Sequence, residues 1–147
     1  MSVRCVSIRL KIPDNEAFTA LATLQRLNVC VAHLERSDVW LLETDEKGGE
    51  FLDAVRANEM LFNPNTHELV ELAQPHPRAG EVWVEELGED PGLRARLGGK
   101  MISGVRSAKR LSGWRLFTQT GVPAEDSILK SAADVLLCNP AIERALT

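Results

Sequence analysis

The sequence predicts an α+β fold in which one structural unit occurs twice. The stretch MLFNPNTHE, Met60 to Glu68, is echoed by LLCNPAIER, Leu136 to Arg144. The same order of strand and helix patterns can be traced in both halves of the chain. Between the halves, QPHPRAG (Gln74 to Gly80) contains two prolines and a glycine, which is typical of a connector. We therefore expect repeat 1 over residues 1–76 and repeat 2 over residues 77–147.

The echo is strongest at an Asn-Pro pair that ends a helical pattern in each half. One constant offset in residue number, called here the Asn-Pro offset, superimposes Asn63 and Pro64 on Asn139 and Pro140. Further upstream a slightly shorter offset, called here the tryptophan offset, superimposes Trp40 on Trp114. The difference between the two offsets is typical of an insertion between two elements. The two Asn-Pro pairs are therefore candidate signatures of the repeat or contacts to a partner.

Repeat 1 begins with an alternating apolar pattern and then changes to helical spacing. Pro13 and Asp14 favour the start of a helix. Ser37 and Asp38 predict a hairpin turn between two β-rich runs, and Pro64 stops the second helix. The expected elements are a strand at Val3 to Lys11, a helix from Pro13 to Gln25, strands at Val29 to Arg36 and Val39 to Glu43, a helix at Glu50 to Phe62, and a last strand at Leu69 to Ala73.

Repeat 2 gives a similar series of patterns. Ser112 and Gly113 favour a second hairpin turn. Pro123 favours the start of the last helix, where Glu125 and Asp126 lie well against the helix dipole. The expected elements are a strand at Val82 to Leu87, a short helix at Asp90 to Leu97, strands at Ser103 to Leu111 and Trp114 to Gln119, and a helix at Ala124 to Cys138.

This βαββα order, with a possible final strand, is typical of a ferredoxin-like or closely related α+β fold. The sheet of such a unit buries one face under its helices, so we expect the antiparallel sheets of two copies to pack as a pseudo-dimer. Trp40 and Trp114 occupy equivalent positions in the two repeats. We expect both to pack in the core or between the repeats, and the alternative is a surface that binds a partner.

Composition places the chain among ordinary globular proteins. Apolar residues make up 44% and charged residues 26%, so neither disorder nor a membrane role is indicated. No apolar run approaches the roughly 20 residues that cross a bilayer, and the first residues lack a signal-peptide pattern, so we expect a cytoplasmic protein. Cys5, Cys30 and Cys138 have neither paired nor metal-type spacing, and we expect reduced, buried side chains.

No arrangement of residues predicts catalysis. His33, His67 and His76 lack a metal-ligand spacing, so each is expected on the surface or as the cap of an element. The sequence also lacks Gly-rich phosphate loops and the Gly-x-Ser-x-Gly nucleophile pattern. We expect no catalytic residue, no cofactor and no metal ligand. A group of acidic residues is expected to be solvated: Glu43, Asp45, Glu46 and Glu50.

The distribution of charge supplies a competing hypothesis. Residues 1–78 carry 8 basic and 12 acidic side chains, whereas residues 79–147 carry 9 of each. No acidic residue interrupts the basic segment 94–115. Such a segment can bind nucleic acid or a phosphate-bearing ligand, but a pI near 5.4 and the lack of tyrosine argue against an RNA-recognition sheet. We favour a solvated surface or a docking face for an acidic partner. Its candidate interface residues are Arg106, Lys109, Arg110 and Arg115.

The motif LLCNPAIER resembles the phrase LLANPVIEDY, with which the second helix typically ends in the PurS family, the small subunit of phosphoribosylformylglycinamidine synthase. MLFNPNTHE is a looser version, and Asp90 and Pro91 resemble the Asp-Pro pair before the first helix of the family. The glycine-lysine pair of the family's hairpin is represented only by the Ser-Asp and Ser-Gly pairs at the two predicted turns. In pattern, the chain resembles two fused PurS-like repeats.

The resemblance implies a noncatalytic role. PurS subunits pair into dimers and bridge a glutaminase (PurQ-type) subunit to a synthetase (PurL-type) subunit, in a complex that aminates formylglycinamide ribonucleotide with ammonia from glutamine and with ATP. One chain with two joined units would replace such a dimer. Association of this chain into a homo-oligomer through strand edges stays open. So do two other functions: a small-molecule-sensing regulatory module with a pocket between paired units, and a nucleic-acid-binding protein that uses residues 94–115.

Overall fold

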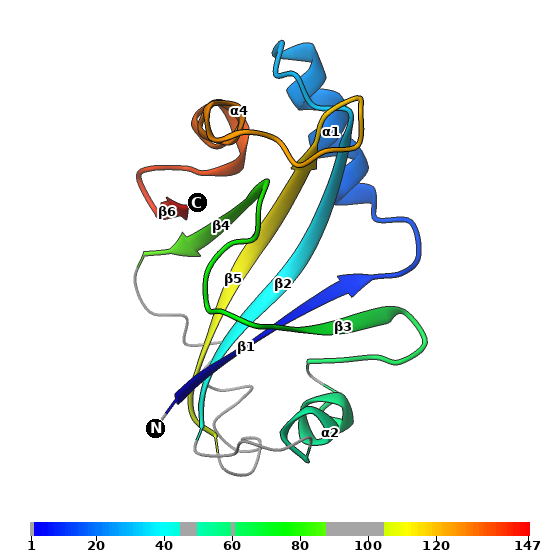
Figure 1. Cartoon of the computed structure of the whole chain (residues 1–147), viewed down its shortest axis with the longest axis vertical. Helices are drawn as coiled ribbons and strands as arrows, with labels where there is room; N and C mark the ends of the chain where they lie inside the picture. The colour runs from blue at the N-terminus through cyan, green and yellow to red at the C-terminus, as the bar shows by residue number, and fades with distance from the viewer. Residues whose placement is uncertain (1, 45–49, 60, 88–104) are drawn as a thin grey trace.

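A computed structural model of the chain describes residues 2–44, 50–59, 61–87 and 105–147. In this part of the chain, six strands form one sheet that three α-helices accompany (Figure 1). The strands are β1 (Ser2–Leu10), β2 (His33–Thr44), β3 (His67–Leu72), β4 (Glu81–Glu86), β5 (Val105–Phe117) and β6 (Glu143–Leu146). The helices are α1 (Asn15–Arg26), α2 (Glu50–Ala57) and α4 (Asp126–Ala132), and α4 continues into a π-helical turn (Ala133–Leu137). The α+β class is as predicted.

The strand order of the sheet is symmetric about its centre. From either edge, the third strand of a half comes first, its first strand comes next, and its second strand lies at the centre. The order is β3-β1-β2-β5-β4-β6, and every neighbouring pair is antiparallel. The long strands β2 and β5 join the two halves, and Asp38 pairs with Ser112 near the middle of their ladder. Asp38 and Ser112 are themselves related by the tryptophan offset. The halves thus share one continuous sheet, whereas the sequence predicted separate sheets that pack together.

The ladders relate residues of the first three strands to counterparts in the last three. Ser7 of β1 pairs with Val39, and Trp83 of β4 pairs with Gly113, which the tryptophan offset relates to Val39. Trp83 is therefore the counterpart of Ser7, and these two residues are related by the Asn-Pro offset. On the edge strands, Ser7 pairs with Val70 of β3 and Trp83 pairs with Leu146 of β6, so Val70 and Leu146 are also related by the Asn-Pro offset. Most strand residues of one half thus have a defined equivalent position in a strand of the other.

Both predicted hairpins are wrong, because β2 and β5 each continue straight through the predicted turn. Ser37 and Asp38 pair with Gly113 and Ser112 in the middle of the sheet. A Cβ atom at position 113 would lie 2.6 Å from Ser37 Oγ and 2.9 Å from Val39 Cγ2. Glycine is needed where side chains approach a strand this closely. Small residues that resemble a turn in the sequence therefore serve a close crossing of two strands.

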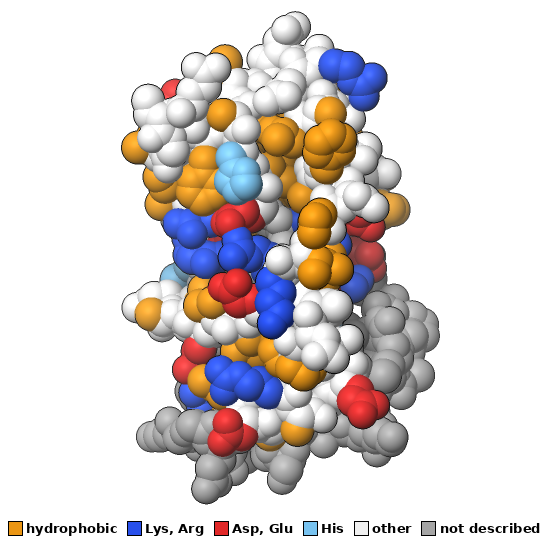
Figure 2. Space-filling view, turned by 90° about the vertical axis from the view of Figure 1, so that its right-hand side faces the viewer, with side chains coloured by type: hydrophobic (Ala, Val, Ile, Leu, Met, Phe, Trp, Pro, Cys, Tyr) orange, Lys and Arg blue, Asp and Glu red, His pale blue; other side chains and the backbone are white. Residues whose placement is uncertain are grey.

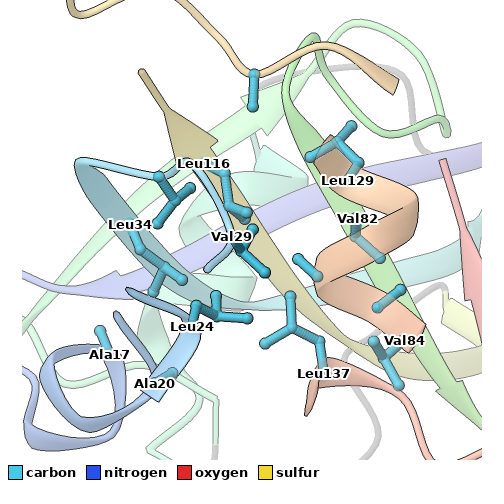
Figure 3. Close-up of a cluster of buried hydrophobic side chains, with 14 residues drawn as sticks. Ala17, Ala20, Leu24, Val29, Leu34, Val82, Val84, Leu116, Leu129 and Leu137 are labelled. Atoms are coloured by element: carbon cyan, nitrogen blue, oxygen red, sulfur yellow. The ribbon is translucent and has the colours of Figure 1, made fainter. Parts of the chain in front are cut away.

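One face of the sheet, called here the helix face, carries two apolar clusters under the helices. The first lies under α1 and α4 (Figure 3), and the second lies against α2 at the other end. Trp40 is buried in the second cluster, and Trp114 packs against the first, which agrees with the core packing predicted for both. Figure 3 labels ten members of the first cluster: Ala17, Ala20, Leu24, Val29, Leu34, Val82, Val84, Leu116, Leu129 and Leu137.

Most other elements lie close to their predicted positions. The observed bounds of β1, α1, β3 and β4 differ from the predicted ones by only a few residues. Helix α2 ends at Ala57, before the expected end at Phe62, and β6 was not predicted. The helix expected at Asp90 to Leu97 lies outside the described residues, as do Asp45 and Glu46. Within the described residues, no helix has the length and apolar character needed to cross a membrane.

The opposite side of the sheet, called here the second face, is crossed by the connector between the halves. Because β3 is an edge strand and β4 lies beyond β1, β2 and β5, residues 73–80 must pass across the sheet, as Figure 1 shows. Strand residues that alternate with those of the helix face point to this side. A third apolar cluster lies here: Cys5, Val39, Leu72, Trp83 and Leu111.

Candidate functional site

A polar pocket of about 250 Å³ opens on the second face where the two halves meet. Five strands and the connector contribute to its wall. Arg115 is the one residue of this wall that the sequence had indicated as a site candidate. The lining consists of three arginines, three glutamates, two serines and a valine: Ser7, Arg9, Glu35, Ser37, Glu68, Val70, Arg78, Glu81 and Arg115.

Glu81 is the most deeply buried charged residue of the pocket, at 1% exposure. Its carboxylate accepts hydrogen bonds from the backbone N–H of Arg78 at 3.0 Å and from the guanidinium of Arg78 at 3.1 and 3.3 Å. A buried carboxylate is tolerated only when such partners replace water. Arg115 also contacts the connector, because its Nε donates to the carbonyl oxygen of Ala79 at 3.3 Å. These bonds hold the connector over the second face.

Arg9 joins two carboxylates from neighbouring strands. Its guanidinium forms an ion pair with Glu35 of β2 and another, at 3.3 Å, with Glu68 of β3. These side chains are between 26% and 48% exposed, so each pair contributes less than about 1 kcal/mol. Figure 2 shows basic and acidic side chains together in a band across one side of the molecule, with hydrophobic side chains around it.

Glu85 occupies the centre of a second ion triad, on β4. It pairs with Lys109 of β5 and, at 2.5 Å, with Arg144 of β6. Burial raises the pKa of Glu85, but the hydrogen bonds and charges of Lys109 and Arg144 lower it by a larger amount. The resulting pKa lies below the usual value of 4.5. The carboxylate is therefore held in its ionised form.

The two triads occupy counterpart positions with every charge reversed. Each has a central residue on the first strand of its half and partners on the second and third strands. The three counterpart pairs are Arg9 with Glu85, Glu35 with Lys109, and Glu68 with Arg144. The geometry of the triad is thus common to both halves, while the sign of the exposed charge differs.

Reversing the charge of Arg9 alone is expected to destabilise the protein, because Arg9→Glu would place three carboxylates together. We expect the free energy of unfolding to fall by about 1 to 2 kcal/mol. The triple variant Arg9→Glu/Glu35→Lys/Glu68→Arg copies the other triad and should stay within about 1 kcal/mol of the unmodified chain. Urea unfolding at low salt measures both. A triple variant no more stable than Arg9→Glu would contradict the equivalence of the triads.

Glu85 is expected to contribute stability that depends on pH. Because its folded pKa lies below 4.5, the contribution is complete above that value and is lost as pH falls through the folded pKa. The unmodified chain should therefore exceed Glu85→Gln in stability at neutral pH, and the difference should vanish in acid. Thermal unfolding across a pH series measures it, with Glu86→Gln on the same strand as control. A difference that persists below the folded pKa would contradict this assignment.

The first Asn-Pro pair forms a tight turn between α2 and β3. The side-chain Oδ1 of Asn63 accepts from the backbone N–H of Asn65 at 3.0 Å, and its carbonyl oxygen accepts from the backbone N–H of His67 at 2.8 Å. The backbone N–H of Asn63 donates to Nδ1 of His67 at 2.9 Å. His67 thus caps this turn, as predicted. Pro64 stands inside the turn, where no backbone donor is required.

The second Asn-Pro pair repeats this turn between the π-helical turn and β6. Oδ1 of Asn139 accepts from the backbone N–H of Ala141 at 3.1 Å. The carbonyl oxygen of Asn139 accepts from the backbone N–H of Glu143 at 2.7 Å. The backbone N–H of Asn139 donates to a carboxylate oxygen of Glu143 at 2.8 Å. Pro140 has the same place as Pro64. The echo in the sequence therefore corresponds to a common Asx turn, and both pairs have a structural role.

The four basic candidates of β5 do not form one surface. Lys109 and Arg115 point to the second face, where they contact Glu85 and line the pocket. Arg110 pairs with Trp40 and therefore lies on the helix face. Arg106 belongs to β5, but its side chain lies outside the described part. Alternation along the strand separates residues that are close in the sequence.

The three cysteines differ in burial. Cys5 is buried as predicted, and burial together with the nearby charge of Glu81 raises its pKa to about 12, so it remains a thiol. The prediction of burial is wrong for Cys30, which is exposed, and Cys138 is partly exposed. Burial also raises the pKa of Cys138. All three are free cysteines in this structure.

No group of three or more metal-ligating side chains comes together in the part of the chain that the structure describes. His33 and His76 are exposed, as predicted. The pocket residues that the sequence did not indicate include Ser7, Ser37 and Glu81. The tryptophan offset contained a signal for one of them, because it aligns Ser37 with the much larger Leu111.

A scan against protein-family models found no family that matches the chain, and a search of curated proteins found no match either.

Proposed function

We propose that the chain is a noncatalytic assembly subunit made of two PurS-like units, which bridges a PurQ-type glutaminase and a PurL-type synthetase in phosphoribosylformylglycinamidine synthase. The observation that carries this proposal is the symmetric strand order around the pairing of Asp38 with Ser112. Two copies of one structural unit, joined along their long strands β2 and β5, would give this order. The same hydrogen bonds in the turns at Asn63 and Asn139 support the idea of a duplicated unit.

The reversed ion triads support a bridge between two different partners. A body with two similar halves can present two similar docking surfaces, and reversing the exposed charges gives each surface a different electrostatic preference. The central charge is Arg9 in one half and Glu85 in the other. The total charge also differs, with a net of −4 over residues 1–78 and zero over residues 79–147.

Reconstitution from purified subunits tests the proposal. The chain should elute from a sizing column together with the glutaminase and synthetase subunits, in the presence of glutamine and ADP-Mg. Omitting the chain should abolish glutamine-dependent synthesis and leave ammonia-dependent synthesis by the synthetase intact. The charge-exchanged variant Arg9→Glu/Glu35→Lys/Glu68→Arg should weaken binding to one partner more than to the other. Failure of both subunits to associate with the chain would reject the bridging function.

A further inference from the structure

Within the described sheet, the positions related to the pocket on the second face by the two offsets form no second pocket, because larger side chains fill them. Ser7 has Trp83 as its counterpart, and Ser37 has Leu111. Trp83 and Leu111 belong to the third apolar cluster, and Leu41 and Leu146 pack against it. Leu41 and Leu146 are the counterparts of Arg115 and Val70. Large apolar side chains therefore fill one side of the second face, while small or polar ones leave about 250 Å³ open on the other.

The charges within the pocket leave one cation without a carboxylate partner. The carboxylates of Glu35 and Glu68 are paired with Arg9, and that of Glu81 is paired with Arg78. Arg115 donates to a backbone carbonyl oxygen and lies over the Phe117 ring at 5.2 Å. It forms no ion pair with any carboxylate among the described residues. An anion is therefore the charge that this pocket can accept without breaking an existing pair.

Two hydroxyl groups in the wall of the same pocket are also available. Ser7 and Ser37 are 5% and 7% exposed, and both line the pocket. Neither hydroxyl is hydrogen-bonded to another side chain in the described ranges. Hydroxyl donors beside a guanidinium are suited to the oxygens of a carboxylate or phosphate group. The volume lies just below the range of roughly 300 to 1,000 Å³ typical of ligand sites, so the occupant is a small molecule.

We infer that this pocket binds a small metabolite through one oxyanion group, a carboxylate or a phosphate, with Arg115 as the main cation and Ser7 and Ser37 as hydroxyl donors. The site belongs to both halves, because Ser7 and Ser37 come from the first and Arg115 from the second. The connector closes it through Arg78. The inference does not depend on the bridging function, since it concerns the isolated chain.

Titration of the isolated chain with inorganic phosphate and, separately, with succinate tests the site by amide NMR. We expect saturable shifts of the amides of Ser7, Ser37 and Arg115 with at least one probe, and the probe that binds identifies the phosphate or the carboxylate source. Arg115→Gln should weaken that binding by about tenfold or more. The control Arg110→Gln changes a basic residue of the same strand on the helix face and should leave the affinity unchanged.

A second variant separates the pocket from general surface charge. Ser7→Trp introduces the counterpart residue and should abolish binding while Arg115 keeps its charge, and the circular dichroism spectrum would establish that the variant is folded. If Ser7→Trp fails to fold, Arg115→Gln alone decides the outcome. The inference is overturned if neither probe gives saturable shifts at these amides, or if Arg110→Gln weakens binding as much as Arg115→Gln.

Discussion

Replacing Trp83 by alanine is expected to lower the free energy of unfolding by about 3 to 5 kcal/mol. Trp83 is 1% exposed and belongs to the third apolar cluster with Cys5, Val39 and Leu111. Its removal would leave a large cavity in this cluster, because the surrounding side chains belong to sheet strands that cannot collapse into the space. Urea unfolding measures the effect. A loss below about 1 kcal/mol would show that the second face does not depend on this side chain.

Trp83→Phe is the matched control for this prediction. The indole Nε1 of Trp83 is buried, and it has no hydrogen-bond partner among the residues that the structure describes. Phenylalanine would remove this unsatisfied donor, whose burial costs about 1 to 3 kcal/mol, while it keeps most of the apolar volume. We therefore expect Trp83→Phe to stay within about 1 kcal/mol of the unmodified chain. A loss similar to that of Trp83→Ala would indicate that the indole nitrogen has a partner in solution.

The sequence predicted the elements whose patterns are local. The alternation in β1 and the helical spacing of α1 depend only on neighbouring residues, and both elements formed where expected. The two predicted hairpins were wrong because the conformation of their residues depends on pairing with distant parts of the chain. Ser37 is a good turn residue in isolation, and only its pairing with Gly113, far along the chain, makes it the middle of a strand. β6 was missed because four residues are too few to show a period.

The pocket was harder to predict than the fold. Ser7 and Ser37 look like ordinary strand residues, and Glu81 looks like a solvated charge before a strand. Their proximity depends on the ladders between strands and on the path of the connector across the second face. A comparison of side-chain size at equivalent positions of the two repeats would have indicated part of the pocket, since the tryptophan offset aligns Ser37 with the larger Leu111.

Removing the guanidinium of Arg78 is expected to cost about 2 to 3 kcal/mol of stability. Arg78→Met keeps the length of the side chain. Among the described residues, it leaves the carboxylate of Glu81, at 1% exposure, with only the backbone N–H of residue 78 as a donor. Breaking a fully buried pair costs about 3 to 5 kcal/mol, and the side chain of Arg78 is 33% exposed, which reduces the effect. Chemical unfolding of Arg78→Met at neutral pH is the measurement.

The double variant Arg78→Met/Glu81→Gln separates loss of the pair from loss of the connector. If the cost comes from an unpaired buried charge, neutralising Glu81 as well should recover at least half of the stability lost in Arg78→Met. If Arg78 instead acts by holding the connector over the sheet, the double variant should be no more stable than the single one. The first outcome is expected, because the side-chain amide introduced at position 81 can still accept from the backbone N–H of residue 78 and carries no charge to desolvate.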